Sequence, residues 1–299
     1  MPSVIAVDVG GTSIKAACSD ETGRVLDRRS VRTPVADGAQ AIVAAIGSVA
    51  RELLRDDVRA LGVVVPGAVD AANGLAGYAA NLAWRDVPLR GQLEIELGLP
   101  VVIENDVRAA GLAERTLGRA RDVPDCLIVV IGTGIAGVVV AGGAPIVGAA
   151  GLAGELGHVS VRADGEVCAC GQRGCAERYA SGAAIARRYA ERSGSSRTAE
   201  EIADRLACDP HAAQVWAEAA DALGALLAAV TQIVDPSLIV LAGGLARAGG
   251  TLRAPVQRAL EQHLVWRAPP EVGVSPLAGE AGVLGAALLA WQAAAPTPR

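Results

Sequence analysis

The sequence contains no phenylalanine, one methionine and one lysine, and aromatic residues make up only 2% of it. Hydrophobic residues make up 52% of the sequence, and nearly all of them are aliphatic, so the hydrophobic core must be built from aliphatic side chains. With 20% charged residues, the composition is typical of a folded globular protein and excludes a disordered one. A length of 299 residues favours two domains and excludes a peptide hormone or a disulfide knot.

An excess of basic residues is also missing, since Lys+Arg 27 stand against Asp+Glu 32, for a net charge of −5. Nucleic acid is therefore not an expected partner. The N-terminus lacks the basic stretch and apolar run of a secretion signal, so we expect a cytoplasmic protein. In a reducing compartment, the six cysteines are expected to be thiols or metal ligands.

One stretch, from Cys126 to Gly154, carries no charge and is long enough to cross a bilayer. Glycines and Pro145 interrupt it, and short runs of valine and isoleucine fill the gaps. This pattern favours two buried strands joined by a turn, and we expect no membrane partner.

The chain opens with a predicted β-hairpin. A strand from Val4 to Val9 leads into Gly10-Gly11-Thr12, and apolar residues resume from Ile14 to Cys18. A strand from Arg24 to Arg32 and an amphipathic helix from Ala39 to Leu54 follow. Further strands are predicted at Ala60–Val65, Val101–Ile103, Leu127–Ile131, Ile135–Ala141 and Leu238–Leu241, in a chain that is mostly helical from Ala183 onward and ends in a helix at Gly282–Ala294.

The strand, glycine-threonine turn and strand pattern occurs twice, at the N-terminus and again around Gly132-Thr133-Gly134. The simplest interpretation is an internal duplication of a phosphate-binding hairpin. We expect a small N-terminal α/β domain over residues 1–117 and a larger one over residues 118–281. The last helix, 282–294, is expected to pack back on the first domain.

The first turn has the residues that a phosphate site needs. Glycines let backbone N–H groups approach phosphate oxygens, Thr12 adds a hydroxyl, and Asp8 can hold magnesium or its waters. Such a turn between strands is also compatible with a purely structural role. Lys15 is either a point charge near a phosphate or a solvated strand residue.

The most specific local signal is His-x9-Cys-x-Cys-x4-Cys, formed by His158, Cys168, Cys170 and Cys175. Three thiolates and an imidazole suit a closed tetrahedral zinc site, which is structural because it leaves no position for substrate. The alternative is a set of buried or disulfide-paired cysteines. Cys18, Cys126 and Cys208 are interpreted as ordinary thiols.

Three acidic residues are candidates for the chemistry. Asp106 follows a buried strand, where ligands of α/β proteins are held, and it is either a general base, the N-cap of the next helix, or both. Glu155 ends the uncharged run and is either a solvated surface residue or buried enough to need hydrogen-bonding partners, which a polyol would supply. Glu177 follows the last cysteine of the zinc loop, 158–175.

Taken together, these residues resemble the ROK family of sugar kinases and sugar-responsive regulators, and most closely its bacterial glucokinases. The resemblance runs in order from Val4 to about Ala290. The matching segments are Asp8 to Lys15, Val65-Pro66-Gly67, Asn81 to Leu89, Glu104-Asn105-Asp106, Gly132-Thr133-Gly134, Gly154 to His158 and Cys168 to Glu177.

The resemblance implies an actin-like fold, with two α/β domains around a cleft, and an ATP-dependent kinase that uses magnesium and a structural zinc. Asp106 would be the general base on the primary hydroxyl of the sugar. The implied sugar-binding residues are Gly67, Asn81, Asn105, Asp106, Glu155, His158 and Glu177. The implied residues around ATP and magnesium are Asp8, Gly10, Gly11, Thr12, Lys15, Thr133, Gly134, Gly243 and Gly244.

The implied activity is phosphorylation of the 6-hydroxyl of glucose, by a homodimer or tetramer. Alternatives are another acceptor, such as mannose, an N-acetylated hexosamine or a cyclitol, another donor, such as polyphosphate, or a sugar-binding protein without catalysis. A regulator is not expected, because Asp8 lies too near the start for a preceding DNA-binding module.

The sequence departs from the family pattern at two places. Ala136 and Val138 flank Gly137 after the second turn, where family kinases usually have more glycine. Their methyl and isopropyl groups either crowd the backbone approach to phosphate or are tolerated variation. Val107 and Arg108 follow Asp106, where Ala-Asn is common in the family. Arg108 either contacts the substrate or pairs with a carboxylate such as Glu104.

Overall fold

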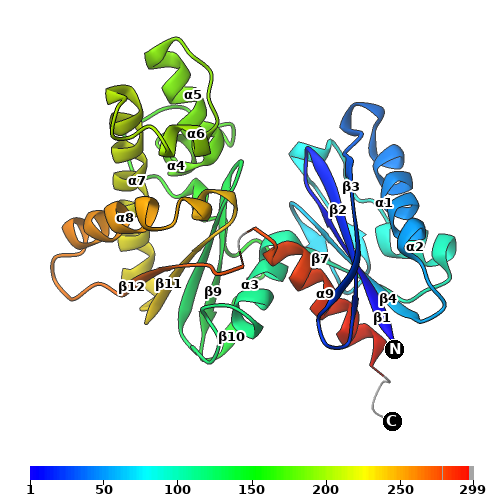
Figure 1. The fold of residues 1–299 in the computed structure, drawn as a ribbon. Coiled ribbons are helices and arrows are strands. Elements are labelled where there is room, and N and C mark those ends of the chain that lie inside the picture. Colours follow the sequence, from blue (N-terminus) through cyan, green and yellow to red (C-terminus); the bar gives the residue numbers. More distant parts are fainter. Residues whose placement is uncertain (278, 296–299) are drawn as a thin grey trace. The chain divides into compact units, whose positions relative to one another are not determined.

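A computed structural model describes residues 1–277 and 279–295, which form two compact units (Figure 1). Unit 1 comprises Met1–Ala113 together with the chain from Glu280 onward, and unit 2 comprises Glu114–Gly279. The predicted boundary at residues 117 and 118 lies a few residues after this division. Unit 1 therefore contains chain from both ends of the sequence.

Unit 1 contains a five-stranded sheet in the order β3-β2-β1-β4-β7. The strands β1, β2 and β3 are antiparallel neighbours, whereas β4 and β7 run parallel to β1. The bounds are β1 Ser3–Val9, β2 Ser13–Asp20, β3 Val25–Arg32, β4 Val58–Val65 and β7 Val101–Asn105, with short strands β5 Val69–Asp70 and β6 Leu75–Ala76. The helices are η1 Val35–Asp37, α1 Ala39–Leu53, η2 Ala80–Leu82, α2 Leu89–Leu97, α9 Ala281–Ala294 and α3 Asp106–Thr116, whose last turn belongs to unit 2.

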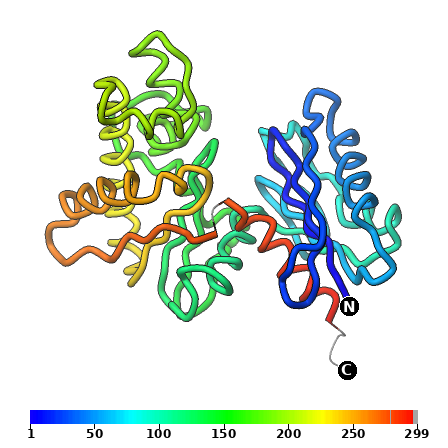
Figure 2. The backbone as a smooth tube through the Cα atoms, viewed as in Figure 1, coloured from blue at the N-terminus to red at the C-terminus, as the bar shows by residue number. Residues whose placement is uncertain are grey.

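Strand periodicity explains how unit 1 buries both faces of its sheet. Along β1, Ile5 and Val7 join a core cluster with residues of α1 and α2, whereas Val4 and Ala6 join clusters with α9. Figure 1 shows α1 and α2 on one face and α9 on the other. A Cβ on Gly62 of β4 would lie 2.1 Å from the Ala286 carbonyl oxygen, so this position needs glycine. Figure 2 shows the red C-terminal helix running beside the blue N-terminal strands.

The sheet of unit 2 has the order β10-β9-β8-β11-β12 and the same pattern of strand directions as the sheet of unit 1. This correspondence supports the duplication inferred from the sequence. The strands are β8 Cys126–Ile131, β9 Ile135–Ala141, β10 Ala144–Pro145, β11 Leu238–Ala242 and β12 Glu271–Val274. The helices are η3 Leu156–His158, α4 Glu177–Ala180, α5 Gly182–Ser193, α6 Ala199–Ala203, α7 Pro210–Val234, η4 Gly244–Ala248 and α8 Gly250–His263.

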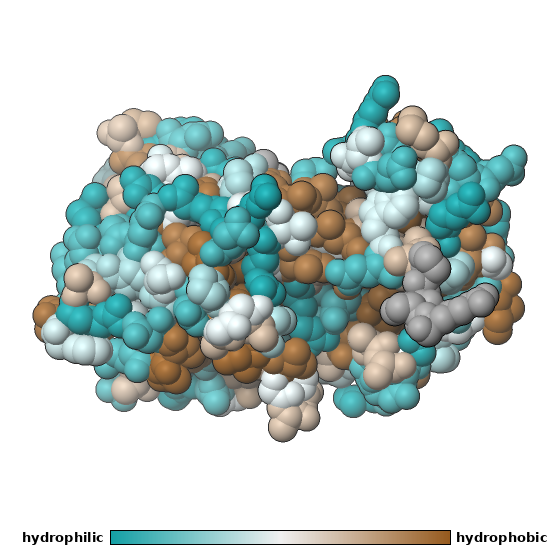
Figure 3. All heavy atoms as spheres, turned by 90° about the horizontal axis from the view of Figure 1, so that it is seen from below, coloured by the Kyte–Doolittle hydropathy of each residue, from teal (hydrophilic) through white to brown (hydrophobic). Residues whose placement is uncertain are grey.

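The uncharged run contains β8 and β9, as predicted, followed by a mostly exposed segment from Ala141 to Ala153. Among residues 1–277 and 279–295, α7 is the one helix that has the length and composition to cross a membrane. Its Leu223, Leu226 and Leu227 are fully buried in the core of unit 2, as in the central helix of a globular domain. On the face drawn in Figure 3, hydrophilic side chains alternate with smaller groups of hydrophobic ones.

Candidate functional site

The first glycine-rich turn, Gly10–Thr12, joins β1 to β2 and is fixed by backbone contacts. The Gly10 N–H donates to the Ser13 carbonyl at 2.9 Å, and the Thr33 hydroxyl donates to the Gly10 carbonyl at 2.6 Å. The Thr33 N–H also donates to the Thr12 carbonyl at 3.0 Å. The Thr12 side chain itself is exposed, so the turn presents its hydroxyl to solvent.

Asp8 lies at the base of this turn, opposite Lys15 across the β1–β2 ladder. A Cβ on Gly282, in the first turn of α9, would lie 2.6 Å from Asp8 Oδ2, so the carboxylate sits beside a helix N-terminus. Burial raises the pKa of Asp8, Lys15 opposes this shift, and Glu280 adds to it. A cation bound beside Asp8 would offset the cost of burying its charge.

The predicted acceptor residues gather where β7 ends and α3 begins. Asp106 is the first residue of α3, and its Oδ1 accepts from the Val107 N–H at 2.9 Å. Asn105 is the residue that caps the helix, since its Oδ1 accepts from the N–H groups of Val107 and Arg108, both at 3.0 Å. The prediction of Asp106 as the N-cap is therefore wrong: capping requires a residue just outside the helix, and Asp106 lies inside it.

Asn105 also links α3 to the segment that follows β4. Its Nδ2 donates to the Gly67 carbonyl at 2.9 Å. Gly67 has φ +83°, and a Cβ there would lie 2.2 Å from the Tyr78 carbonyl oxygen, so only glycine fits. Asn81 is exposed, and a Cβ on Gly11 would lie 3.3 Å from its carbonyl oxygen. Unit 1 therefore brings the first turn close to one of the predicted sugar ligands.

In unit 2, the second turn lies between β8 and β9 and is tied to Glu177. Glu177 Oε2 accepts from the Ile135 N–H at 2.9 Å, and a Cβ on Gly134 would lie 2.4 Å from the same oxygen. Gly132 is joined to the start of α5, because the Gly182 N–H donates to its carbonyl at 2.8 Å. Thr133, at the tip of the turn, is exposed.

The two unusual residues after this turn lie inside β9. Ala136 pairs with Val130 and Val138 with Ile128 across the ladder, and Val138 is only 4% exposed. Val138 therefore lies in the buried part of the strand, outside the second turn.

Glu155 precedes η3, which contains His158. The Glu155 side chain is exposed, so of the two alternatives the structure has the solvated one. The reason is local: the mostly exposed segment that precedes it carries the chain to the surface. An exposed carboxylate at this position remains free of the desolvation cost that burial would impose.

The cysteine cluster forms as predicted, with the ligand atoms of His158, Cys168, Cys170 and Cys175 all within 4.8 Å of one another. His158 Nδ1 lies 3.8 Å from Cys168 Sγ, and Cys170 Sγ lies 3.6 Å from Cys175 Sγ. Tetrahedral zinc with thiolate ligands at about 2.3 Å separates them by roughly 3.8 Å, so these residues fit the ion. Burial and the neighbouring thiols raise the pKa of Cys175 to about 12. Outside the cluster, burial also raises the pKa values of the Cys18 and Cys126 thiols.

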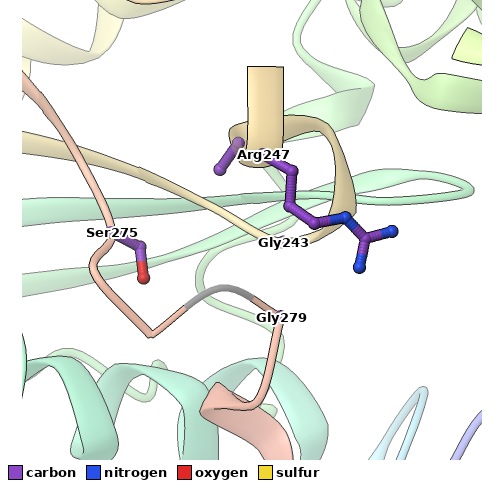
Figure 4. A pocket seen from close by; sticks show the side chains of 5 residues that line it. Gly243, Arg247, Ser275 and Gly279 are labelled. Atoms are coloured by element: carbon purple, nitrogen blue, oxygen red, sulfur yellow. The ribbon is translucent and has the colours of Figure 1, made fainter. Parts of the chain in front are cut away.

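Two cavities in unit 2 adjoin the Gly243-Gly244 turn. The first, of about 310 Å³, is lined by Gly244 and Thr133, by apolar residues of α5 such as Ala183, and by the polar side chains of Thr198 and Glu200. It brings together two of the predicted ATP-binding residues. The second, of about 360 Å³, is lined by Gly243, Ala246, Arg247, Ser275 and Gly279 (Figure 4).

Sequence reasoning missed most residues of the first cavity. Ala183 and Ala186 carry no chemical signal, because small apolar residues occur everywhere in this chain. Thr198 and Glu201 form a capping box at the start of α6, and this spacing is a recognisable sequence signal that would have located the wall containing Glu200. Arg247 of the second cavity pairs with Glu200 of the first, with Nε to Oε1 at 2.8 Å.

Comparisons with known proteins show which family this chain resembles in sequence and in fold. The family model described as "ROK family" matches residues 4–293. A glucokinase from Streptomyces coelicolor is 34% identical over 97% of this chain and 98% of its own length. An N-acetylmannosamine kinase from Citrobacter koseri is 33% identical over 96% of this chain and 98% of its own. The crystal structure of a ROK family glucokinase from Streptomyces griseus, in complex with glucose and AMPPNP, has a TM-score of 0.87 at 34% identity and covers 97% of this chain and 99% of that one.

The actin-like fold expected from the resemblance is confirmed by this structural similarity over nearly the full length. The family model spans both units and contains each of the two glycine turns, the Asp106 region and the cysteine cluster. From its sequence and its fold, the chain belongs to the ROK family.

Proposed function

We propose that this chain is a glucokinase, which transfers the γ-phosphoryl group of ATP to the 6-hydroxyl of glucose. The observation that carries the proposal is Asp106 at the head of α3, beside an Asn105 that also holds Gly67, in a chain similar over its whole length to a glucokinase structure with glucose and AMPPNP. A carboxylate beside such polar groups can accept the proton of an attacking hydroxyl.

Asp106 is the proposed general base. In the reaction, the O–H bond of the sugar hydroxyl breaks as its oxygen bonds to the γ-phosphorus, the proton passes to the Asp106 carboxylate, and ADP leaves with the electrons of the broken P–O bond. Most of the rate acceleration in phosphoryl transfer comes from positioning and charge neutralisation. The other proposed sugar ligands are Gly67, Asn81, Asn105, Glu155, His158 and Glu177.

The nucleotide is proposed to bind the two glycine turns and the Gly244 cavity. Backbone N–H groups of Gly11 and Gly134 and the hydroxyls of Thr12 and Thr133 suit phosphate oxygens. Gly10, whose N–H donates to the Ser13 carbonyl, is proposed to shape the first turn around them. The apolar wall of α5 suits a flat nucleobase. Asp8, with its raised pKa and its neighbour Lys15, is the proposed partner of magnesium, which neutralises phosphate charge when bound. Gly243 is placed beside the nucleoside.

Zinc is the proposed ion of the cysteine cluster, with a structural role. The ring nitrogen Nδ1 of His158 faces the thiols, so Nε2 is the nitrogen proposed to bind a sugar hydroxyl. The cluster would thereby fix the direction of the imidazole without taking part in the phosphoryl transfer.

A second candidate is N-acetylmannosamine, because a kinase of that name is nearly as similar to this chain as the glucokinase is. Its acetamido group needs space and a polar partner at the 2-position, so few pocket changes separate the two acceptors. A sugar-binding protein without catalysis is less well supported, since Val138 lies buried in β9, outside the second turn.

The test is ADP release from ATP and magnesium with the zinc-loaded protein and a panel of glucose, mannose, N-acetylmannosamine and a cyclitol. Turnover that is highest on glucose supports the proposal. Turnover on another acceptor alone would show that this acceptor, and not glucose, is the substrate. Replacing ATP with polyphosphate tests the identity of the phosphoryl donor. Sugar-dependent stabilisation without any turnover would contradict a kinase.

Light scattering during gel filtration tests the proposed homodimer or tetramer, and cell fractionation tests the proposed cytoplasmic location.

A further inference from the structure

Arg108, in the first turn of α3, forms a partly buried ion pair with Glu104 near the end of β7. Arg108 Nε lies 2.8 Å from Glu104 Oε1, and Nη2 lies 2.5 Å from the same oxygen. The side chains are 17% and 23% exposed, so solvent screens this pair less than an ordinary surface pair. Of the two roles left open by the sequence, the structure therefore supports pairing with Glu104.

The same guanidinium also reaches a third element. Arg108 Nη2 donates to the Val69 carbonyl in β5 at 3.3 Å, while the neighbouring Asn105 donates to the Gly67 carbonyl at 2.9 Å. The side chains of Asn105, which caps α3, and of Arg108, in its first turn, thus hold the backbone of residues 67–69 at two carbonyls two residues apart. Glu104 orients the Arg108 side chain for this contact, because a fork held by a carboxylate has few other conformations.

Residues 67–69 in turn pack against the segment that leads to Asn81. The Ala68 N–H donates to the Tyr78 carbonyl at 3.0 Å, and the Gly77 N–H donates to the Ala68 carbonyl at 2.8 Å. Gly67 approaches Tyr78 so closely that a Cβ would not fit. A movement of the backbone at Val69 would therefore displace Gly67 and the start of the segment that carries Asn81.

We propose that Arg108 is a positioning residue for the sugar acceptor, holding residues 67–79 against α3 so that Gly67 and Asn81 face Asp106 in one arrangement. This inference rests on the proposed sugar kinase function and assigns to Arg108 an effect on acceptor affinity. The contacts of Arg108 with Glu104 and Val69 lie beside Gly67 in unit 1, so its removal is expected to act mainly on sugar binding.

Arg90 provides a matched control on the same hairpin. From α2, its Nη1 and Nη2 donate to the Ala71 and Ala72 carbonyls at 3.2 and 3.1 Å, at the far end of the β5–β6 hairpin. Arg90→Asn removes arginine–carbonyl bonds of the same kind, but from the tip of the hairpin and not from the side that contacts α3. Comparing Arg90→Asn with Arg108→Asn therefore separates general loosening of the hairpin from loss of the link between α3 and Val69.

The experiment compares wild type, Arg108→Asn, Arg108→Lys and Arg90→Asn by steady-state kinetics and by hydrogen exchange at the Ala68 and Gly77 amides. Losing a charge-assisted contact to a partly buried group is expected to raise the KM for sugar about tenfold in Arg108→Asn, with the KM for ATP and kcat changed less than about twofold. Exchange at both amides becomes faster. Arg90→Asn leaves the KM for sugar near the wild-type value.

Arg108→Lys keeps the charge beside Glu104 but lacks the planar fork, so it preserves thermal stability and still raises the KM for sugar. A sugar KM unchanged in Arg108→Asn, raised equally in Arg90→Asn, or fully restored in Arg108→Lys overturns the proposal. If the wild-type protein turns over no sugar, the proposed function fails by itself. The exchange rates then decide whether Arg108 holds the segment: faster exchange in Arg108→Asn supports this, and unchanged exchange overturns it.

Discussion

The Glu177 carboxylate accepts a hydrogen bond from the backbone N–H of Ile135 at 2.9 Å. Glu177 begins the short helix that follows the cysteine cluster, and Ile135 is the first residue after the second glycine turn. This contact joins the proposed zinc loop to the proposed phosphate loop within unit 2. A change at either end is therefore expected to affect the other.

Glu177→Gln and Glu177→Ala are expected to separate the role of Glu177 at the second turn, where it accepts from Ile135, from its proposed role in binding sugar. The glutamine keeps an oxygen that can accept from Ile135, so the KM for ATP should stay near that of the wild type. The alanine leaves the N–H without its partner and should raise the KM for ATP about tenfold. Both variants should raise the KM for sugar. Equal ATP KM values in the two variants would disprove a role of this bond in shaping the turn.

Gly134→Ala should destabilise the protein, whereas Gly132→Ala in the same turn should not. A Cβ on Gly134 would lie 2.4 Å from Glu177 Oε2, which is already fixed by Ile135, while a Cβ on Gly132 meets no atom within 4 Å. Overpacking of this kind costs about 1–3 kcal/mol. Urea unfolding of the two variants measures the difference, and similar stabilities would show that the Glu177 side chain moves freely.

Asp8→Asn should stabilise the ligand-free protein at neutral pH. Burial raises the pKa of Asp8 above 3.8, so the folded protein binds this proton more tightly than the unfolded chain, and stability falls as pH rises through that window. The cost of burying the charge therefore grows with pH, so the stability gained by the asparagine should be larger at pH 7.5 than at pH 4. Denaturant unfolding at both pH values tests this.

The same Asp8→Asn variant should lose most of its affinity for magnesium-ATP, because an amide cannot replace a carboxylate beside the cation. Opposite effects on stability and on nucleotide binding are typical of a functional site. A variant that is both less stable and fully active would contradict the proposed role of Asp8.

Cys170→Ser should remove bound zinc and lower the Tm, since one thiolate of four ligands is lost. Cys208→Ser is the control, because Cys208 is exposed and lies outside the cluster. Elemental analysis of the purified proteins and thermal unfolding with and without a chelator give the two readouts. Equal zinc content in both variants would refute the cluster as the metal site.

Local patterns in the sequence predicted much of this structure. The glycine turns, the strands around them and the cysteine cluster were predictable because their geometry depends on residues close together in the chain. The sequence interpretation placed the cap on Asp106 because aspartate and asparagine both cap helices, and only the backbone shows that Asn105 lies outside α3. Strand β12 was missed because it is four residues long and consists of Glu271–Val274 after two prolines.

Contacts between distant segments were beyond sequence reasoning. The bond from Arg108 to Val69 spans 39 residues, and no spacing rule relates the two positions. The exposure of Glu155 depends on the path of the preceding segment, which the composition of that segment does not determine. Such features follow from tertiary packing, where propensity and periodicity carry no information.

The most direct test of the proposed activity is the identity of the product. Wild-type protein is incubated with ATP, magnesium and glucose, and glucose 6-phosphate is detected by coupling to its dehydrogenase. The account predicts stoichiometric formation of glucose 6-phosphate and ADP, with turnover reduced by a factor on the order of 1000 or more in Asp106→Asn while glucose still binds. Absence of glucose 6-phosphate, or turnover in Asp106→Asn within tenfold of wild type, would contradict it.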